Sequence, residues 1–291
     1  MKDQTFALPD RRQLGYCIVG EGVPVLYFHG TASSRLEVLL LKEFASTNHL
    51  QIVGVDRPGF GLSTPVQKKT LRGFAEDVNR LMEHLQFNRV AVLGWSGGGA
   101  FTLAYVALFP ERVSKCVVVS APALPFDVAT AHNRSLARFA MKFPLVGMLA
   151  MNGMRSQVLK ANADIDGFLA SKKGRDLLKS WCSEDTKFFS DKTWLKLMYG
   201  SMAEAFRQGK PSVKAVLQEH QLFMKTWDAT LTGIPVGKVV VWQGTDDKTC
   251  RVDNAYRIAD AVSGAQVEIF SGEGHCVMFN HLDRLAGILR V

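Results

Sequence analysis

Short apolar runs rich in Val, Ile and Leu recur along the first and last parts of the chain, and stretches with helical spacing of apolar residues separate them. Such runs are typical of strands buried on both faces of a sheet. The alternation predicts an α/β fold, in which a mostly parallel, doubly wound sheet carries helices on both faces. Two strand-like runs around Pro9-Asp10, within residues 5–20, add a β-hairpin. Strands are expected over residues 23–28, 51–55, 90–93, 113–120, 238–243 and 266–270, and helices over 34–46, 70–86, 101–108, 252–263 and beyond Asn280.

The alternation stops in the middle of the chain. Residues 122–232 contain no convincing strand, but helical patterns run over about 132–151, 174–182, 187–208 and 212–227. We interpret this segment as a helical cap placed over the carboxyl edge of the sheet, and we expect residues 1–121 and 233–291 to form the core domain. Most of its methionines and aromatic residues should pack internally. Because thioethers adapt to varied shapes, some of them should line a substrate pocket beneath the cap.

The charge is uneven along the chain. The net charge is +8, and the predicted cap contributes most of the excess of lysine and arginine. A basic face can attract anionic substrates or surfaces, but a solvated exterior explains the same composition. Because we find no lysine/arginine cluster and no nucleic-acid-binding motif, no nucleic-acid partner is expected.

The remaining composition suggests a cytoplasmic protein without a metal or other cofactor. No run of about 18 apolar residues indicates a membrane span, and Met1-Lys2-Asp3-Gln4 lacks the apolar segment of a signal peptide. Five scattered cysteines without C-x-x-C spacing suggest free thiols in a reducing compartment. Histidines outside the motifs below form no cluster, so no metal site is predicted.

The stretch with the clearest chemical signal follows the expected strand 90–93. Gly94-Trp95-Ser96-Gly97-Gly98 leads from this strand into the helix that begins near Phe101. A G-x-S-x-G sequence between a strand and a helix is the nucleophile elbow, which exposes a strained serine at its apex. Gly94 and Gly98 keep side chains out of the tight turn. The Gly97 N–H lies at a helix start, where negative charge is favoured.

Two further signals lie downstream of Ser96, each at the end of an expected strand. Gly244-Thr245-Asp246-Asp247 follows the strand 238–243, and Gly272-Glu273-Gly274-His275 follows the strand 266–270. Doubly wound sheets place their sites at this edge. Either Asp246 or Asp247 could therefore serve as an acid partner of His275.

Together these motifs resemble the α/β-hydrolase fold family, in its serine-nucleophile esterase, lactonase and C–C hydrolase branch with an inserted lid. The likeness runs over residues 5–121 and from 234 to the end. It also rests on His29-Gly30, which is similar to the family's oxyanion loop, and on Asp56-Arg57-Pro58-Gly59-Phe60-Gly61-Leu62-Ser63. The chain departs from the family at Asp10-Arg11-Arg12, where a glycine often follows the aspartate, and at Cys250-Arg251, where a proline is common.

The resemblance implies a catalytic triad of Ser96, Asp247 and His275. Asp247 is selected because the family's acid loop has a glycine, two residues and then the aspartate. It also implies that the N–H groups of Gly97 and Thr31 form the oxyanion hole. His29, Gly30, Gly94 and Gly98 would shape the site without taking part in proton transfer.

We therefore expect a hydrolase that cleaves carboxylic esters through an acyl-enzyme. A lactonase, a thioesterase and a C–C bond hydrolase would use the same triad, and a non-catalytic ligand-binding protein is the alternative from another class. The expected partner is a small-molecule ester or lactone, without stable membrane insertion, and a homodimer stays open.

Overall fold

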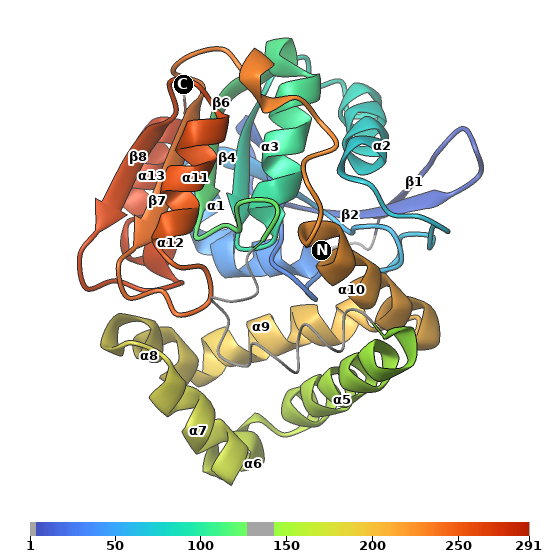
Figure 1. Ribbon diagram of the computed structural model, residues 1–291, viewed down its shortest axis with the longest axis vertical. Coiled ribbons are helices and arrows are strands. Elements are labelled where there is room, and N and C mark those ends of the chain that lie inside the picture. The colour runs from blue at the N-terminus through green and yellow to red at the C-terminus, as the bar shows by residue number, and fades with distance from the viewer. Residues whose placement is uncertain (1–3, 127–142, 291) are drawn as a thin grey trace.

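The computed structural model describes residues 4–126 and 143–290, and it is built around one eight-stranded sheet (Figure 1). The strands follow the order β1-β2-β4-β3-β5-β6-β7-β8. All neighbours from β4 to β8 pair in parallel, whereas β1 and β2 form an antiparallel hairpin at one edge. The strands are β1 (Gln4–Ala7), β2 (Gln13–Val19), β3 (Val23–Phe28), β4 (Leu50–Val55), β5 (Val90–Trp95), β6 (Val113–Val119), β7 (Val239–Gly244) and β8 (Gln266–Phe270).

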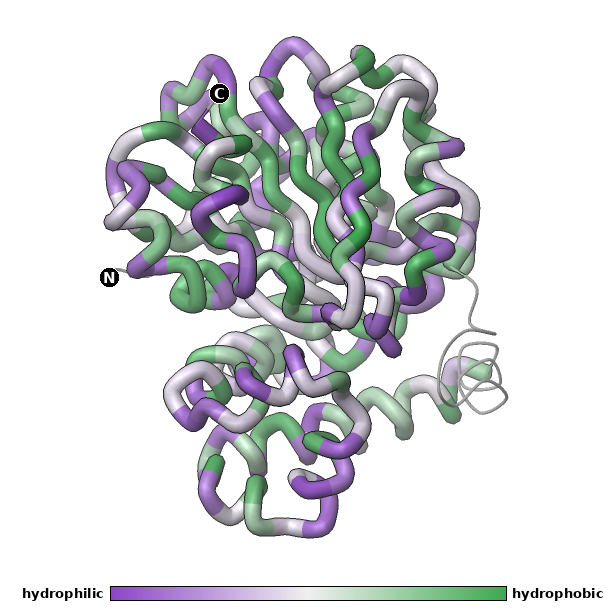
Figure 2. The backbone as a smooth tube through the Cα atoms, turned by 90° about the vertical axis from the view of Figure 1, so that its left-hand side faces the viewer, coloured by the Kyte–Doolittle hydropathy of each residue, from purple (hydrophilic) through white to green (hydrophobic). Residues whose placement is uncertain are grey.

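Successive side chains of a strand point to opposite faces, so the sheet separates two hydrophobic cores. In β3, Leu26 and Phe28 belong to one core, while Val25 and Tyr27 belong to the other. Figure 2 shows the apolar segments gathered along the central strands. This double burial explains why the strands are apolar runs rather than alternating patterns, and it confirms the expected doubly wound, mostly parallel sheet.

Helices cover both faces of the sheet. On one face lie α2 (Leu71–His84), α3 (Gly98–Leu108) and α11 (Asp253–Ala261), and on the other lie the 3-10 helix η1 (Arg35–Leu41), α1 (Lys42–Thr47), α12 (Val277–Asn280) and α13 (Leu282–Leu289). Thr70 caps α2 by accepting a hydrogen bond from the Gly73 N–H, as expected. The predicted helix over 34–46 is instead a 3-10 helix continued by a short α-helix.

Between β6 and β7, the described helices form a layer across the carboxyl edge of the sheet (Figures 1 and 2). We call its described residues, 143–232, the cap. The helices are α5 (Pro144–Ala163), α6 (Ile165–Ala170), α7 (Lys172–Ser180), α8 (Ser183–Ser190), α9 (Lys192–Ala205) and α10 (Lys210–Phe223). The proposed domain boundaries at 121 and 233 stay a prediction.

Two helix predictions in the cap were wrong in extent. The expected helix over 187–208 is divided into α8 and α9, because Asp191 has an extended backbone and its side chain accepts from the Trp194 N–H, which starts a new helix. The expected helix over 132–151 falls partly outside the described residues. Its described part begins at Pro144 and continues to Ala163.

The hairpin carries the departure noted at Asp10-Arg11-Arg12. Arg11 has a φ of 67°, a left-handed conformation that glycine adopts most easily. The register pairs Phe6 with Leu14, as a turn at Pro9-Asp10 requires. The substitution of arginine for a family glycine therefore costs local strain, without altering the hairpin.

Within residues 4–126 and 143–290, no helix has the length and apolar character needed to cross a membrane.

Candidate active site

Ser96 lies at the apex of a sharp turn between β5 and α3. Its φ is 53°, and its N–H donates to the Val119 carbonyl at the end of the neighbouring strand. A β-carbon at Gly98 would overlap the carbonyl oxygen of Phe28, and one at Gly94 would overlap the hydroxyl of Thr102. Only glycine fits at these two positions, so the turn brings α3 close to the sheet while holding Ser96 in a strained backbone.

Asp247 and His275 meet at the ends of β7 and β8. The Nδ1 of His275 donates to the Oδ2 of Asp247 at 2.9 Å, while the N–H groups of Thr249 and Cys250 donate to Oδ1 at 2.8 and 2.9 Å. Gln243 donates to Oδ2 at 3.0 Å. These four donors hold a buried carboxylate in one orientation, with its charge toward the imidazole.

Asp246 lies elsewhere. Its side chain is exposed and accepts from the Thr245 hydroxyl, while its N–H donates to the Glu273 carbonyl. Of the two carboxylates that the loop offers, only Asp247 is bonded to His275.

The surroundings of His275 raise its pKa above the ordinary value of 6.5. Burial by itself would lower that pKa, but the charge of Asp247 and its hydrogen bond outweigh the burial, and Asp185 and Glu37 add smaller contributions. The carbonyl of His275 accepts from the indole of Trp95 at 2.8 Å. His275 is thus held through both its imidazole ring and its backbone carbonyl.

The turn that follows β3 places Thr31 beside Gly97. A β-carbon at Gly97 would lie 3.2 Å from the backbone nitrogen of Thr31. Gly97 is the residue that precedes α3, so its N–H lies at the positive end of the helix dipole. The backbone nitrogen of Thr31 thus lies close to Gly97, the residue that follows Ser96.

Glu37, which the sequence did not single out, and Arg57, from the motif over residues 56–63, hold this turn in place. Glu37 accepts from the Gly30 N–H at 2.8 Å, and Arg57 donates to the carbonyls of His29 and Gly30 at 2.6 and 2.8 Å. His29 is fully buried, and burial together with the charge of Arg57 lowers its pKa well below 6.5. It stays neutral, with Nδ1 bonded to the Gly30 carbonyl at 2.9 Å.

Arg57 also connects the turn to the cap. Its guanidinium binds both carboxylate oxygens of Glu219, on α10, at 2.7 Å, and Lys69 adds a contact to Glu219 at 3.4 Å. All three side chains are buried. Burial would raise the pKa of Glu219, but the charges of Arg57 and Lys69 lower it below 4.5. Arg57 thus links the turn after β3 to the cap.

Ser96 and His275 open on one cavity of about 590 Å³ between the sheet and the cap. Its walls are mainly aromatic and thioether side chains, a composition suited to an apolar ligand. Four of the cap's methionines line it, as expected for some of them: Met154, Met198, Met202 and Met224. Few polar side chains other than Ser96 and His275 reach it, chiefly Thr31, Tyr199, His220, Lys248 and Thr249.

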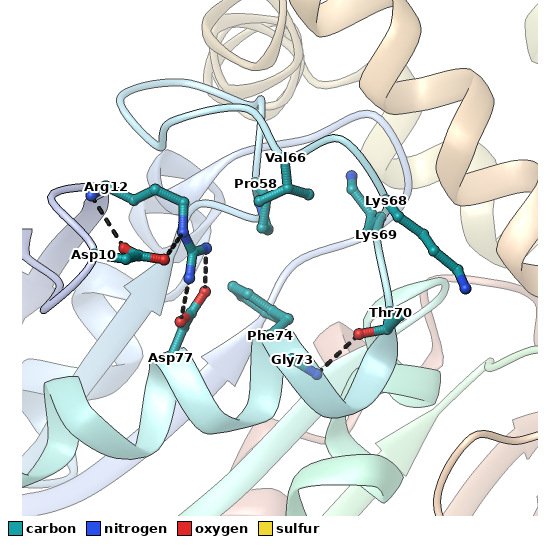
Figure 3. Close-up of a pocket in the computed structure, with 10 residues that line it drawn as sticks. All are labelled: Asp10, Arg12, Pro58, Val66, Lys68, Lys69, Thr70, Gly73, Phe74 and Asp77. Atoms are coloured by element: carbon teal, nitrogen blue, oxygen red, sulfur yellow. Dashed lines mark hydrogen bonds and ion pairs between the residues drawn. The ribbon is translucent and has the colours of Figure 1, made fainter.

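A second, smaller cavity of about 210 Å³ lies beside the start of α2 (Figure 3). Three of its charged side chains are paired with one another, since Arg12 donates to both Asp10 and Asp77. The Thr70 hydroxyl is already occupied, because it accepts from the Gly73 N–H at the N-terminus of α2. This cavity therefore does not bring together an activated nucleophile and a base.

The cysteines are buried free thiols. Burial raises the pKa of the Cys276 thiol well above 9, with a smaller contribution from the charge of Asp185. Cys276 is thus poorly suited to act as a thiolate nucleophile, although it follows His275 directly.

Comparisons with known proteins find hydrolases among the proteins similar to this chain. An uncharacterized hydrolase of Bacillus subtilis (strain 168), YcgS, is 31% identical over 116 residues, which covers 38% of this chain and 39% of that protein. A 2-hydroxy-6-oxononadienedioate/2-hydroxy-6-oxononatrienedioate hydrolase of Comamonas testosteroni is 23% identical over 80% of this chain and 73% of that protein. The chain thus spans well under half of the first relative and about three quarters of the second.

Solved structures share the fold over nearly the whole chain. An alpha/beta hydrolase fold protein from Nakamurella multipartita superposes with a TM-score of 0.70 at 22% identity, covering 99% of both chains. An esterase from Exiguobacterium antarcticum has a TM-score of 0.68 at 17% identity, covering 99% of this chain and 98% of that one. The enol-lactonase from Burkholderia xenovorans LB400 has a TM-score of 0.64 at 17% identity, covering 98% and 97%.

The sequence model of the alpha/beta hydrolase fold matches residues 23–282. Because this match covers most of the chain, and the sheet and its flanking helices have the same architecture, the protein belongs to the alpha/beta hydrolase fold family.

Proposed function

We propose that this protein is a serine hydrolase that cleaves carboxylic ester bonds through an acyl-enzyme. The observation that carries the proposal is the Asp247–His275 pair, which shares one apolar cavity with a serine at a strained elbow. A nucleophile, a base and a group that orients the base are the three parts that this chemistry requires.

In the proposed mechanism, His275 takes the proton of Ser96 as the hydroxyl oxygen attacks the ester carbonyl carbon. Asp247 holds the imidazole with its Nδ1 protonated and stabilises the imidazolium that forms. The N–H groups of Gly97 and Thr31 would receive the oxyanion, and each such donor contributes roughly 2.7–4 kcal/mol in a transition state. His275 then protonates the departing alcohol, and a water activated by His275 hydrolyses the acyl-enzyme.

The cavity supports a small or medium apolar acyl group. Its tryptophan, phenylalanine and methionine side chains give few polar anchors, so the fit of the acyl chain should dominate selectivity. An enol-lactonase and a C–C bond hydrolase occur among the related proteins, and both reactions remain alternatives within the same site.

Hydrolysis of a p-nitrophenyl ester series, from acetate to palmitate, tests the proposal. We expect turnover with an optimum at short or medium chain length, because longer chains exceed a cavity of about 590 Å³. A fluorophosphonate probe should add one adduct per chain, which peptide mass mapping should locate on Ser96. No turnover and no adduct on folded protein would refute serine hydrolase activity, whereas an adduct without ester turnover would favour a lactone or C–C substrate.

The pH dependence of kcat/KM provides a second test. His275 must be neutral to accept the proton of Ser96, and its pKa is raised above 6.5. We therefore expect kcat/KM to rise with pH along an acid limb whose midpoint lies above 6.5. Initial rates at low substrate concentration and constant ionic strength measure this limb. A midpoint well below 6.5 would contradict the assignment of His275 as the base.

A further inference from the structure

Asp185 is a buried carboxylate of the cap. It contacts the backbone of the loop over residues 271–276, between β8 and α12, which we call the histidine loop. It lies in the first turn of α8 and is 1% exposed. Its Oδ2 accepts from the His275 N–H at 2.8 Å, and its Oδ1 accepts from the Cys276 N–H at 2.8 Å. Both oxygens are therefore bonded to one loop of the core, about 90 residues further along the chain.

The histidine loop is shaped to receive this carboxylate. A β-carbon at Gly274 would overlap the Oδ2 of Asp185 and crowd the Sγ of Cys182. Glycine at this position thus lets the loop approach α8 closely. The fit is specific to Asp185, because Glu184 on the same helix turn instead pairs with Lys187 near the surface.

A buried carboxylate without a cation is costly. Among residues 4–126 and 143–290, Asp185 has no lysine or arginine partner within ion-pair distance. Its hydrogen bonds to backbone N–H groups offset part of that cost. During turnover, the nearest positive charge to arise would be the imidazolium of His275. Asp185 already binds the backbone N–H of that residue.

We propose that Asp185 is a positioning residue through which the cap completes the active site, by fixing the backbone of His275 and by stabilising the imidazolium. This inference rests on the proposed function, because it assigns His275 the role of base. It implies that the cap does more than enclose substrate, since displacement of α8 would release the histidine loop.

Other groups also face His275, and the test must separate them from Asp185. Asp247 bonds to the ring and Glu37 acts from η1, while the thiols of Cys182 and Cys276 lie near Asp185. Lys248 lines the same cavity at its exposed edge. Asp185 does not line the cavity, so its replacement should change kcat rather than KM.

The test compares Asp185→Asn with Glu184→Gln, which removes a carboxylate from the same turn. In Asp185→Asn, we expect kcat to fall by about tenfold to a hundredfold with KM little changed, because one bond to a backbone N–H and the charge are lost. Removal of the negative charge favours neutral imidazole, so the acid limb of kcat/KM should move to lower pH. Glu184→Gln should match the wild type in both properties.

An NMR titration of the His275 imidazole in both proteins reports the same charge effect without turnover. It therefore distinguishes failure of this inference from failure of the proposed function, which wild-type inactivity and absence of a fluorophosphonate adduct would reveal. A lower imidazole pKa in Asp185→Asn supports the inference. An unchanged pKa, or a kcat within about twofold of wild type, overturns it.

If Asp185→Asn does not fold, Asp185→Glu carries the test. It retains the charge but lengthens the side chain by one methylene group, so kcat should fall at least about tenfold while the acid limb stays in place. A kcat within about twofold of wild type would show that the position of this carboxylate does not matter.

Discussion

Replacing Ser96 with alanine is expected to lower kcat for ester hydrolysis by roughly 10⁴–10⁶-fold, because the variant lacks the proposed nucleophile. Fluorophosphonate labelling should be lost completely. The fold should be unchanged, since alanine can occupy the same backbone conformation at a φ of 53° at a similar cost. Single-turnover rates measure the loss of hydrolysis, and intact mass measures the loss of labelling.

Ser120→Ala is a matched control for this prediction. Ser120 directly follows β6, the strand beside β5, has a φ of 49° and is fully buried. Its hydroxyl has no hydrogen-bond partner among the described residues. Its removal should leave kcat within about twofold and should not destabilise the protein. Equal losses in the two variants would contradict a nucleophilic role for Ser96.

Replacing Glu219 with alanine is expected to lower the free energy of unfolding by about 3–5 kcal/mol, because it leaves buried cations without their partner. Burial already lowers the pKa of Lys69 to about 8, so this lysine can lose its proton at modest cost. Arg57 cannot do so. The uncompensated charge would therefore remain on Arg57, beside the turn that follows β3. Urea unfolding at neutral pH measures the loss.

Glu76→Ala is the control for the stability prediction. Glu76 pairs with Arg72 on the surface at 4.0 Å, with both side chains about half exposed, so its removal should change stability by no more than about 0.5 kcal/mol. The pH dependence gives a further check. Because the pKa of Glu219 is lowered from 4.5, its contribution is fully present above that pH and is lost as the pH falls through the folded pKa. Equal stability in the two variants would show that the buried ion pair contributes little.

Local pattern explains why much of the core could be predicted. The strands from β3 to β7 are largely buried on both faces, so each one is visible as an apolar run, whereas β8 at the sheet edge alternates polar and apolar residues. The start of helix α2 is marked by Thr70, whose hydroxyl accepts from the N–H of Gly73, three residues later. The elbow could be located because its motif occupies five consecutive residues, although Gly98 is required by the carbonyl of Phe28, which is distant in the sequence, while Gly94 is required by Thr102.

The cap was less predictable, since packing decides where its helices end. The separation of α8 from α9 depends on whether Asp191 caps a new helix or continues the old one, and both choices suit its composition. Likewise, no local pattern distinguishes the methionines that line the cavity from Met151, which packs in the cap's own core. Helical spacing shows that such residues face inward, but not what they face.

The sequence by itself determined the alternation of strands and helices, the position of the elbow and the candidate residues at the ends of β5, β7 and β8. Those features depend on neighbours in the chain. Only the tertiary structure selected Asp247 over Asp246 by contact, and only it revealed Asp185 and Glu219 as buried carboxylates. Each of these meets its partner across a long stretch of sequence, and a lone carboxylate in a helix of the cap looks the same whether it faces water or a backbone N–H.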